Sequence, residues 1–184
     1  MGIFSDSLDK ATANTFTRPL PKTPQSQMRF LVKTATGTRA AADVLGVSQR
    51  TVERYVKGQI KQPRPELAAR LTDEVRRRWQ PRVRAKARQQ AATTGGITIE
   101  TRARFGYTAA PGTTDDARIR LITQHLPPDY AARLLDAHTA GATDQQLQQI
   151  AAEGLQEIYF KDRGHRAAGL QVAFTDIDYI ELDF

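Results

Sequence analysis

The stretch Thr38-Arg-Ala-Ala-Ala-Asp-Val-Leu-Gly-Val-Ser-Gln-Arg-Thr-Val-Glu-Arg-Tyr-Val-Lys57 decides the fold of the amino-terminal half. Its spacing predicts two short helices joined by a tight turn, a helix-turn-helix at about residues 38–57. Ala42 is the small residue that lets the two axes approach, and Gly46 tolerates the positive φ that the turn requires. The positions predicted to point inward are apolar: Ala41, Leu45, Val47, Val52 and Tyr55.

The second of these helices has a polar outer face. Ser48 is a good N-cap for it, because its hydroxyl can accept a hydrogen bond from the first turn. Amide and guanidinium groups on such a face can reach adenine and guanine edges in the major groove of DNA. An ordinary helical hairpin with a solvated face has a similar pattern, but the basic flanks favour DNA binding. The candidate contact residues are Ser48, Gln49, Arg50, Glu53, Arg54 and Lys57.

A further helix is expected from about Glu66, and it ends in a dense basic run. Pro81 is expected to kink or interrupt it. A charge run is usually a solvated helix face, yet few acidic residues lie nearby, so phosphate contact is the preferred interpretation. The run holds seven positive charges in thirteen residues: Arg76, Arg77, Arg78, Arg82, Arg84, Lys86 and Arg88.

Charge is unevenly distributed over the 184 residues, whose net charge is +7. Residues 1–104 hold 21 Lys and Arg against 8 Asp and Glu, whereas residues 105–184 hold 6 against 12. This asymmetry predicts that the basic part meets a polyanion. A membrane surface is the weaker alternative, because the basic residues do not flank a strongly apolar helical face.

Composition also excludes several classes of site. The chain has no cysteine, and its three histidines are not closely spaced, so neither a disulfide nor an all-protein metal site is expected. No run approaches the roughly 20 apolar residues that span a bilayer. The amino terminus lacks the basic and apolar regions of a secretory signal. We therefore expect a cytoplasmic protein with no membrane partner.

The periodicity predicts an α+β fold in two domains. A helical DNA-binding domain is expected over residues 1–92, a hinge at 93–96, and an α/β domain over 97–184. Apolar and polar residues alternate over 97–105 and again at the carboxyl terminus, which predicts two strands. If these strands pair, acidic side chains lie near Arg102 and Arg104. Helices are predicted at about 3–13, from 25 up to Gly37, from 66, and at 115–125, 128–139 and 144–161.

Several longer strings carry a resemblance that extends nearly end to end. The chain resembles the telomere terminal proteins (Tpg) that cap linear Streptomyces-type chromosomes and plasmids. The strings are Phe16-Thr-Arg-Pro19, Ser48-Gln-Arg-Thr-Val-Glu-Arg-Tyr-Val56, Arg78-Trp-Gln-Pro81, Ala91-Ala-Thr-Thr-Gly-Gly96 and Gly112-Thr-Thr-Asp-Asp-Ala-Arg-Ile-Arg120.

The resemblance implies a protein primer, in which a threonine hydroxyl accepts the first deoxynucleotide from a DNA polymerase and stays joined to the 5′ end. That threonine corresponds to Thr114, with Thr113 adjacent. From the residues alone the alternative remains open that Thr113 or Thr114 simply caps a helix beginning near Asp115. Tyr107 is a competing acceptor, because a phenol of pKa about 10 is easier to deprotonate than an alcohol.

The implied partners are telomeric DNA ends, the replicative polymerase and a telomere-associated recruiting protein. No cofactor of its own is expected, because the polymerase supplies the magnesium ions. Such a protein is not an enzyme, since the linked hydroxyl is used once. The rival function is a helix-turn-helix transcription regulator whose second half dimerises. A nuclease or relaxase acting through Tyr107 is a third, which lacks a convincing metal site.

Overall fold

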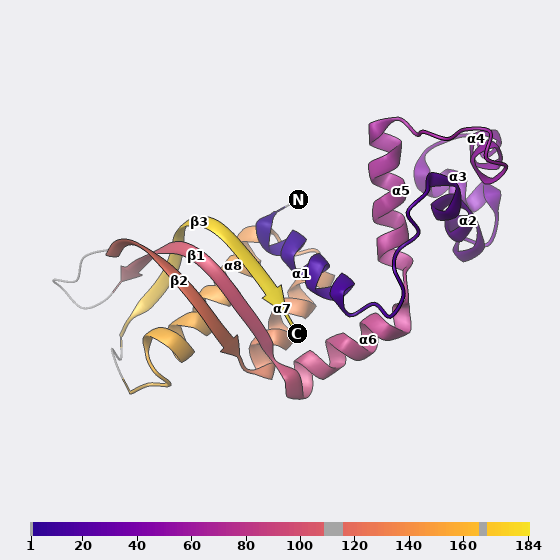
Figure 1. The fold of residues 1–184 in the computed structure, drawn as a ribbon. Coiled ribbons are helices and arrows are strands. Elements are labelled where there is room, and N and C mark those ends of the chain that lie inside the picture. The colour runs from indigo at the N-terminus through magenta and orange to yellow at the C-terminus, as the bar shows by residue number, and fades with distance from the viewer. Residues whose placement is uncertain (1, 109–115, 166–168) are drawn as a thin grey trace. The chain divides into compact units, whose positions relative to one another are not determined.

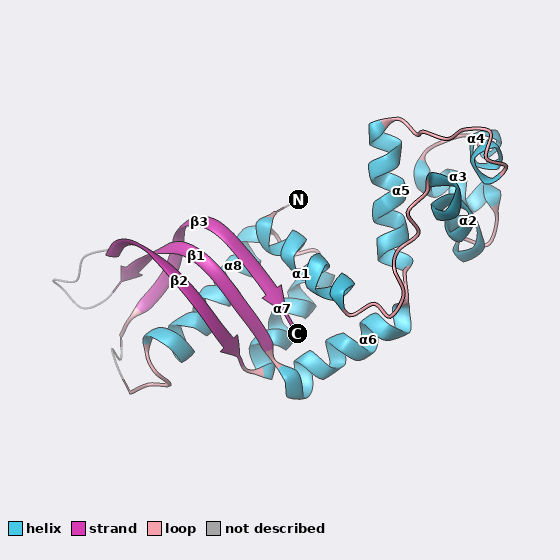
Figure 2. Cartoon of the chain, in the orientation of Figure 1, coloured by secondary structure: helices cyan, strands magenta, loops and turns pink. Residues whose placement is uncertain are grey.

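The computed structural model describes residues 2–108, 116–165 and 169–184. The fold is α+β, with several helices and one three-stranded antiparallel sheet (Figures 1 and 2). The chain forms two compact units. One is Phe16–Pro81, called here the helical unit, and the other combines residues up to Thr15 with Arg82–Phe184, called here the sheet unit.

The helical unit is built from α2 (Pro24–Thr34), α3 (Thr38–Leu45), α4 (Gln49–Val56) and α5 (Pro65–Arg78). Proline stands in the first turn of both α2 and α5, where its missing N–H costs no hydrogen bond. Thr23 and Ser26 form a capping box at the start of α2. The apolar stripes of the four helices meet in one core, which includes Met28, Leu31, Leu45, Val52, Leu71 and Val75.

The sheet unit contains strands β1 (Ile97–Thr108), β2 (Asp116–Leu126) and β3 (Gln171–Asp183) in the order β2-β1-β3. Its helices α1 (Ile3–Asn14), α7 (Pro128–Thr139) and α8 (Asp144–Leu155) pack on the sheet (Figure 1). Helix α6 (Pro81–Gln90) leads into a π-helical turn at Ala91–Gly95, and a second such turn, Gln156–Phe160, follows α8.

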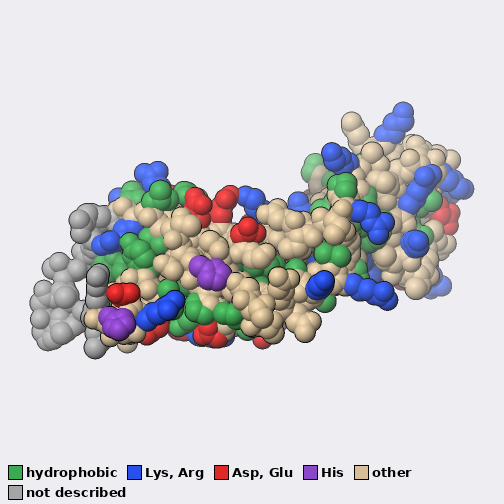
Figure 3. Space-filling model, turned by 60° about the horizontal axis from the view of Figure 1, so that its bottom comes forward, with side chains coloured by type: hydrophobic (Ala, Val, Ile, Leu, Met, Phe, Trp, Pro, Cys, Tyr) green, Lys and Arg blue, Asp and Glu red, His purple; other side chains and the backbone are tan. Residues whose placement is uncertain are grey.

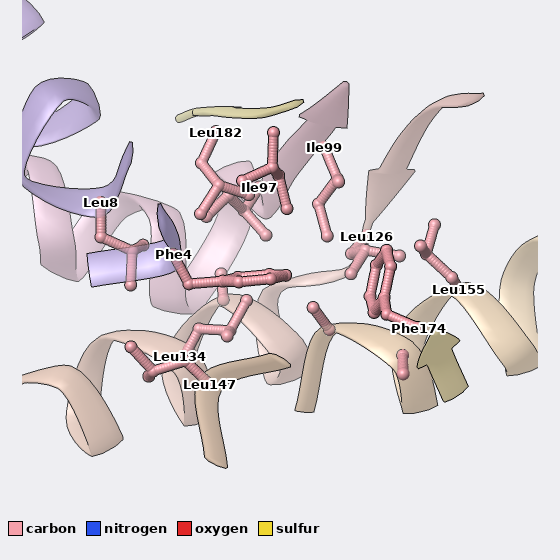
Figure 4. Close-up of a cluster of buried hydrophobic side chains, with 14 of the residues drawn as sticks. Phe4, Leu8, Ile97, Ile99, Leu126, Leu134, Leu147, Leu155, Phe174 and Leu182 are labelled. Carbon is pink, nitrogen blue, oxygen red and sulfur yellow. The ribbon is translucent and has the colours of Figure 1, made fainter. Parts of the chain in front are cut away.

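The core of the sheet unit lies between one face of the sheet and these helices. Alternate residues of β1, such as Ile97 and Ile99, are fully buried, while their neighbours face away. Phe4 and Leu8 of α1 enter the same core, where the Phe4 ring packs edge-on against Phe174 of β3 (Figure 4). Each fully buried aliphatic or aromatic side chain contributes about 1.5–3 kcal/mol, so this layer holds the sheet in place.

The division into units differs from the predicted one in two respects. Helix α1 belongs to the sheet unit: backbone N–H groups of Phe4 and Ser5 donate to Asp144 Oδ1, each at 3.0 Å. The predicted hinge at 93–96 lies inside the sheet unit, where a π-helical turn leads into β1. The chain instead passes between the units at residues 15–16 and 81–82.

The predicted helix at 115–125 is wrong, because this segment forms strand β2. Residues of β2 pair antiparallel with β1, from Ile97 opposite Leu126 to Arg104 opposite Ile119. Ile122 and Leu126 face the core. The pairing to β1 outweighs the local signal of acidic residues at a supposed helix start.

The predicted pairing of the first strand with the carboxyl-terminal strand is confirmed. β1 and β3 are antiparallel neighbours, with bulges at Arg102/Ala103 and Arg104/Phe105. Arg102 Nε lies 3.3 Å from Asp178 Oδ2, which is the expected meeting of basic and acidic side chains. None of the helices in the described ranges has the length and apolar character that a membrane crossing requires.

Candidate nucleic-acid interface

The turn between α3 and α4 has the geometry that the sequence predicts. Gly46 adopts the left-handed conformation, with φ of 63° and ψ of 39°. Val47 N–H donates to the Ala42 carbonyl at 3.0 Å, which closes the end of α3. Ala42 is 2% exposed, and Leu45 and Val52 are fully buried, so the two helices meet on the predicted small and apolar residues.

Both ends of α4 are held by side chains. Ser48 Oγ accepts a hydrogen bond from Thr51 N at 3.2 Å, as its predicted N-cap role requires. At the other end, Gln25 Nε2 and Arg29 Nε of α2 donate to the Val56 carbonyl at 3.1 and 3.2 Å. Sequence reasoning missed Gln25 and Arg29, because nothing local indicates that α2 reaches the end of α4.

The outer face of α4 presents three cations. Arg50, Arg54 and Lys57 are exposed. Within the described ranges none of the three makes an ion pair or a side-chain hydrogen bond. Gln49 Nε2 donates to Glu53 Oε1 at 3.0 Å and to Thr38 Oγ1 at 3.1 Å. The arginines and the lysine are therefore available to a polyanion, whereas Gln49 must exchange two hydrogen bonds to read a base.

The predicted basic run is divided between the two units. Helix α5 ends at Arg78, Trp79 is extended, and Gln80 has a φ of 43°. Pro81 then begins α6, so the predicted interruption at this proline is confirmed. Of the predicted phosphate contacts, three end α5 and four lie on α6: Arg76, Arg77 and Arg78 in the helical unit, and Arg82, Arg84, Lys86 and Arg88 in the sheet unit.

One carboxylate holds two of the α5 arginines. Arg77 Nη2 and Arg78 Nε contact the two oxygens of Glu74, the latter at 3.0 Å. Burial raises the pKa of Glu74, but the hydrogen bonds and charges of Arg77 and Arg78 outweigh it and leave that pKa below its ordinary value. Glu74 therefore remains ionised near neutral pH and partly neutralises this end of α5.

Arg88 has a structural partner that the sequence did not predict. Its Nη2 donates to the Leu135 carbonyl at 2.7 Å and also contacts Thr139 Oγ1, at the carboxyl end of α7. Burial, followed by the charge of Arg84, lowers the pKa of Arg88. A cation at a helix carboxyl terminus stabilises that helix, so Arg88 joins α6 to α7.

Two of the segments that carry the resemblance, Phe16-Thr-Arg-Pro19 and Arg78-Trp-Gln-Pro81, contact each other within the helical unit. Trp79 Nε1 and Gln80 Nε2 both donate to the Arg18 carbonyl, at 3.0 and 2.9 Å, and Thr17 Oγ1 donates to Gln80 Oε1 at 2.8 Å. The Trp79 ring also packs edge-on against Phe30, with centroids 4.8 Å apart. These contacts join the two segments at which the chain enters and leaves the unit.

The predicted priming residue Thr114 and its neighbour Thr113 lie outside the described residues. The elements on either side are described: β1 ends at Thr108 and β2 begins at Asp116. Because a strand follows, the alternative in which these threonines cap a helix is wrong. The competing acceptor Tyr107 is half-buried, with its ring 5.3 Å from that of Phe160.

The arginines at the end of α5 allow a test of their predicted role. Replacing Arg76, Arg77 and Arg78 with glutamine is expected to weaken binding to all DNA sequences alike. The slope of log affinity against log salt should fall by up to about one unit for each lost phosphate contact. Fluorescence anisotropy with specific and random duplexes across a salt series measures both effects.

The matched control replaces Arg102 and Arg104 of the sheet unit with glutamine, which removes cations from outside the helical unit. This variant is expected to keep the salt dependence of the wild type. A loss confined to one DNA sequence in the α5 variant contradicts the prediction, because it means that these arginines read bases.

In the part of the chain that the structure describes, no three His, Asp or Glu side chains come together as a metal site. Comparison of the chain with protein-family models, with curated proteins and with solved structures finds no match.

Proposed function

We propose that this protein binds duplex DNA by placing α4 in the major groove and that it acts as the terminal protein and primer of a linear DNA end. The observation that carries the proposal is the outer face of α4. There Arg50, Arg54 and Lys57 lie exposed on a helix whose two ends are fixed by Ser48 and by side chains of α2. A rigid helix with unpaired cations is suited to groove entry.

The charge of the helical unit supports the same function. Residues 16–81 carry 14 Lys and Arg against five Asp and Glu. Lys and Arg side chains are numerous over this unit, whereas acidic side chains are gathered mainly over the sheet unit (Figure 3). Because phosphate neutralisation dominates DNA affinity, the helical unit carries the electrostatic contribution to binding.

The priming step is proposed for the hydroxyl of Thr114, on the basis of the resemblance. Its oxygen attacks the α-phosphate of a deoxynucleoside triphosphate, a phosphoester bond forms, and pyrophosphate leaves. The proton passes to a base or water in the active site of the polymerase, whose magnesium ions stabilise the developing charge. A telomere-associated recruiting protein brings the complex to the DNA end. The protein therefore needs to supply only an accessible hydroxyl and no catalytic machinery.

The second candidate is a transcription regulator that dimerises through the sheet unit. The observation that favours it is an exposed apolar pair on β2, where Leu121 is 67% and Ile119 is 42% exposed. Such a regulator binds two half-sites related by two-fold symmetry. DNA isolated without protease separates the two functions, because only a terminal protein retards the end fragments until it is digested.

Replacement of Arg54 with alanine tests the groove contact. We expect duplex binding to weaken by about 1–3 kcal/mol if its guanidinium reads a base edge. Titration of a labelled telomeric duplex measures the affinity, and circular dichroism checks that the helices remain. The control Arg102→Ala removes an exposed cation from the sheet unit and should leave the affinity unchanged. If Arg54→Ala and the wild type bind the duplex with equal affinity, the proposal that α4 enters the major groove is wrong.

A further inference from the structure

The sheet unit contains a cavity of 670 Å³ that the proposed function does not use. It lies between α8 and the ends of β1 and β3, and its volume is in the range of small-molecule sites. Its lining is unusual for the number of side-chain amides. Five glutamines line it: Gln145, Gln148, Gln149, Gln156 and Gln171.

Gln145 and Gln148 of α8 share one face with Gln156, the C-cap residue of that helix, because their spacing is helical. Gln145 and Gln148 precede Gln156 by three turns and two turns, so the three side chains lie in one stripe. Gln156 Oε1 accepts a hydrogen bond from Val172 N at 2.8 Å, which fixes this amide against β3. Among the described residues Gln145, Gln148 and Gln171 make no side-chain hydrogen bond, so their donors and acceptors are available to a ligand.

The opposite side of the cavity is partly aromatic. Tyr107 of β1 and Phe174 of β3 contribute to the lining. The Tyr107 ring packs edge-on against Phe160, with centroids 5.3 Å apart and an interplanar angle of 73°. Phe174 is packed against Phe4 and Phe105 in the core. Both rings are therefore held by neighbouring side chains, but Phe174 is only 9% exposed, so the half-buried ring of Tyr107 supplies the stacking surface.

The charges of the lining residues limit which ligands the cavity can bind. Among the described residues neither lysine nor arginine lines the cavity, and the carboxylate that does line it, Glu153, forms an ion pair with Arg133. A phosphate or carboxylate would find no cation among these described lining residues. The ligand that fits is uncharged, offers hydrogen-bond donors and acceptors at its edge, and has a face that packs on an aromatic ring.

We propose that this cavity binds an unstacked nucleobase. Glutamine amides form paired hydrogen bonds with a base edge, most effectively with adenine. Aromatic side chains stack on base faces, and this is the usual way in which proteins hold single-stranded nucleic acid. The site is separate from α4 and lies in the other unit, so the protein has one site for duplex DNA and a second for a single base.

The base can come from a DNA strand or from a free nucleoside, and the experiment separates the two sources. A short single strand that contains one 2-aminopurine, and separately 2-aminopurine deoxyriboside, are titrated with the full-length protein. Stacking on an aromatic ring quenches the fluorescence of this base. We expect quenching that saturates with at least one of the two probes.

The variant Gln145→Leu/Gln148→Leu is expected to weaken this binding about tenfold or more. Neither amide has a hydrogen-bond partner among the described residues, so the variant should fold. The matched control is Gln89→Leu, which removes an exposed amide of α6 that does not line the cavity. Tyr107→Leu should reduce the quenching itself, because it removes the stacking surface.

Duplex binding is measured on the same variants, and it should equal that of the wild type, since α4 is unchanged. If Arg54→Ala loses duplex binding but still binds the base, the result bears on the role of α4, and the nucleobase proposal stands. Three results overturn the nucleobase proposal: no quenching with either probe, equal quenching by the Gln145→Leu/Gln148→Leu variant, or displacement of the probe by an uncharged dipeptide amide.

Discussion

Thr114→Ala is expected to abolish transfer of a nucleotide to the protein, the largest effect that the proposed function predicts. The substitution removes the attacking oxygen. A neighbouring hydroxyl could replace it only if its oxygen lay about 3 Å from the α-phosphate and in line with the bond that breaks. The measurement is incubation with the partner polymerase, magnesium and a radiolabelled deoxynucleoside triphosphate, followed by denaturing electrophoresis. Labelled protein marks the phosphoester.

Two matched variants define the acceptor. Thr114→Ser keeps a hydroxyl and should retain part of the labelling, while Thr113→Ala should label as the wild type does. Duplex binding by all three variants should be unchanged, because α4 lies in the other unit. If Thr114→Ala labels normally, the linkage lies elsewhere, and Thr113 and then Tyr107 are the residues to replace next.

Gly96→Ala is expected to have the largest effect on stability. Gly96 has φ of 70° and ψ of −161°, a region that is essentially restricted to glycine. A Cβ there would lie 2.3 Å from the Leu126 carbonyl oxygen and 2.7 Å from His125 Nε2. The His125 ring can move, but the Leu126 carbonyl belongs to β2, which pairs with β1 at Ile97. Strain and overpacking together should cost on the order of 4 kcal/mol.

The two units allow this loss to be localised. Trp79 is the only tryptophan and belongs to the helical unit, so its fluorescence during urea unfolding reports on that unit. Far-ultraviolet circular dichroism reports on both units. We expect Gly96→Ala to lower the urea midpoint of the circular dichroism signal far more than that of the fluorescence, because the two units have separate cores.

The control for Gly96→Ala is Gly141→Ala. Gly141 also has a positive φ, 79°, but no atom of the described residues other than its chain neighbours lies within 4 Å of an added Cβ. This variant should lose about 1 kcal/mol through backbone strain alone. If the two variants lose equal stability, the close approach to Leu126 is not the cause, and the prediction for Gly96 is wrong.

The helix-turn-helix elements were predictable from the sequence because each of their determinants is local. A small residue at 42, a glycine at 46 and an N-cap at 48 all act within two turns of helix. The break at Pro81 and the alternation of β1 are local signals too. The exposed cations of α4 followed from the same periodicity, since the apolar positions decide which face remains outside.

The remaining features depend on partners that are distant in the sequence. Local signals placed a helix over residues 115–125, and only pairing with β1 makes this segment a strand. The sequence position of Phe4 suggests that it belongs to the amino-terminal helical domain, but in the structure α1 packs on the sheet and Phe4 is part of that core. In the sequence Arg88 is one more basic residue of its run, but in the structure its guanidinium donates a hydrogen bond near the carboxyl end of α7.

The sequence by itself determined the helix-turn-helix, the basic character of α4 and the position of the break before α6. The tertiary structure decided the boundary between the units, the strand β2 and the cavity where the glutamines of α8 face Tyr107 and Phe174. The physical reason is the separation along the chain over which each kind of interaction acts. Caps, turns and periodicity act over a few residues, whereas strand pairing and burial join residues far apart in the chain and can override local preference.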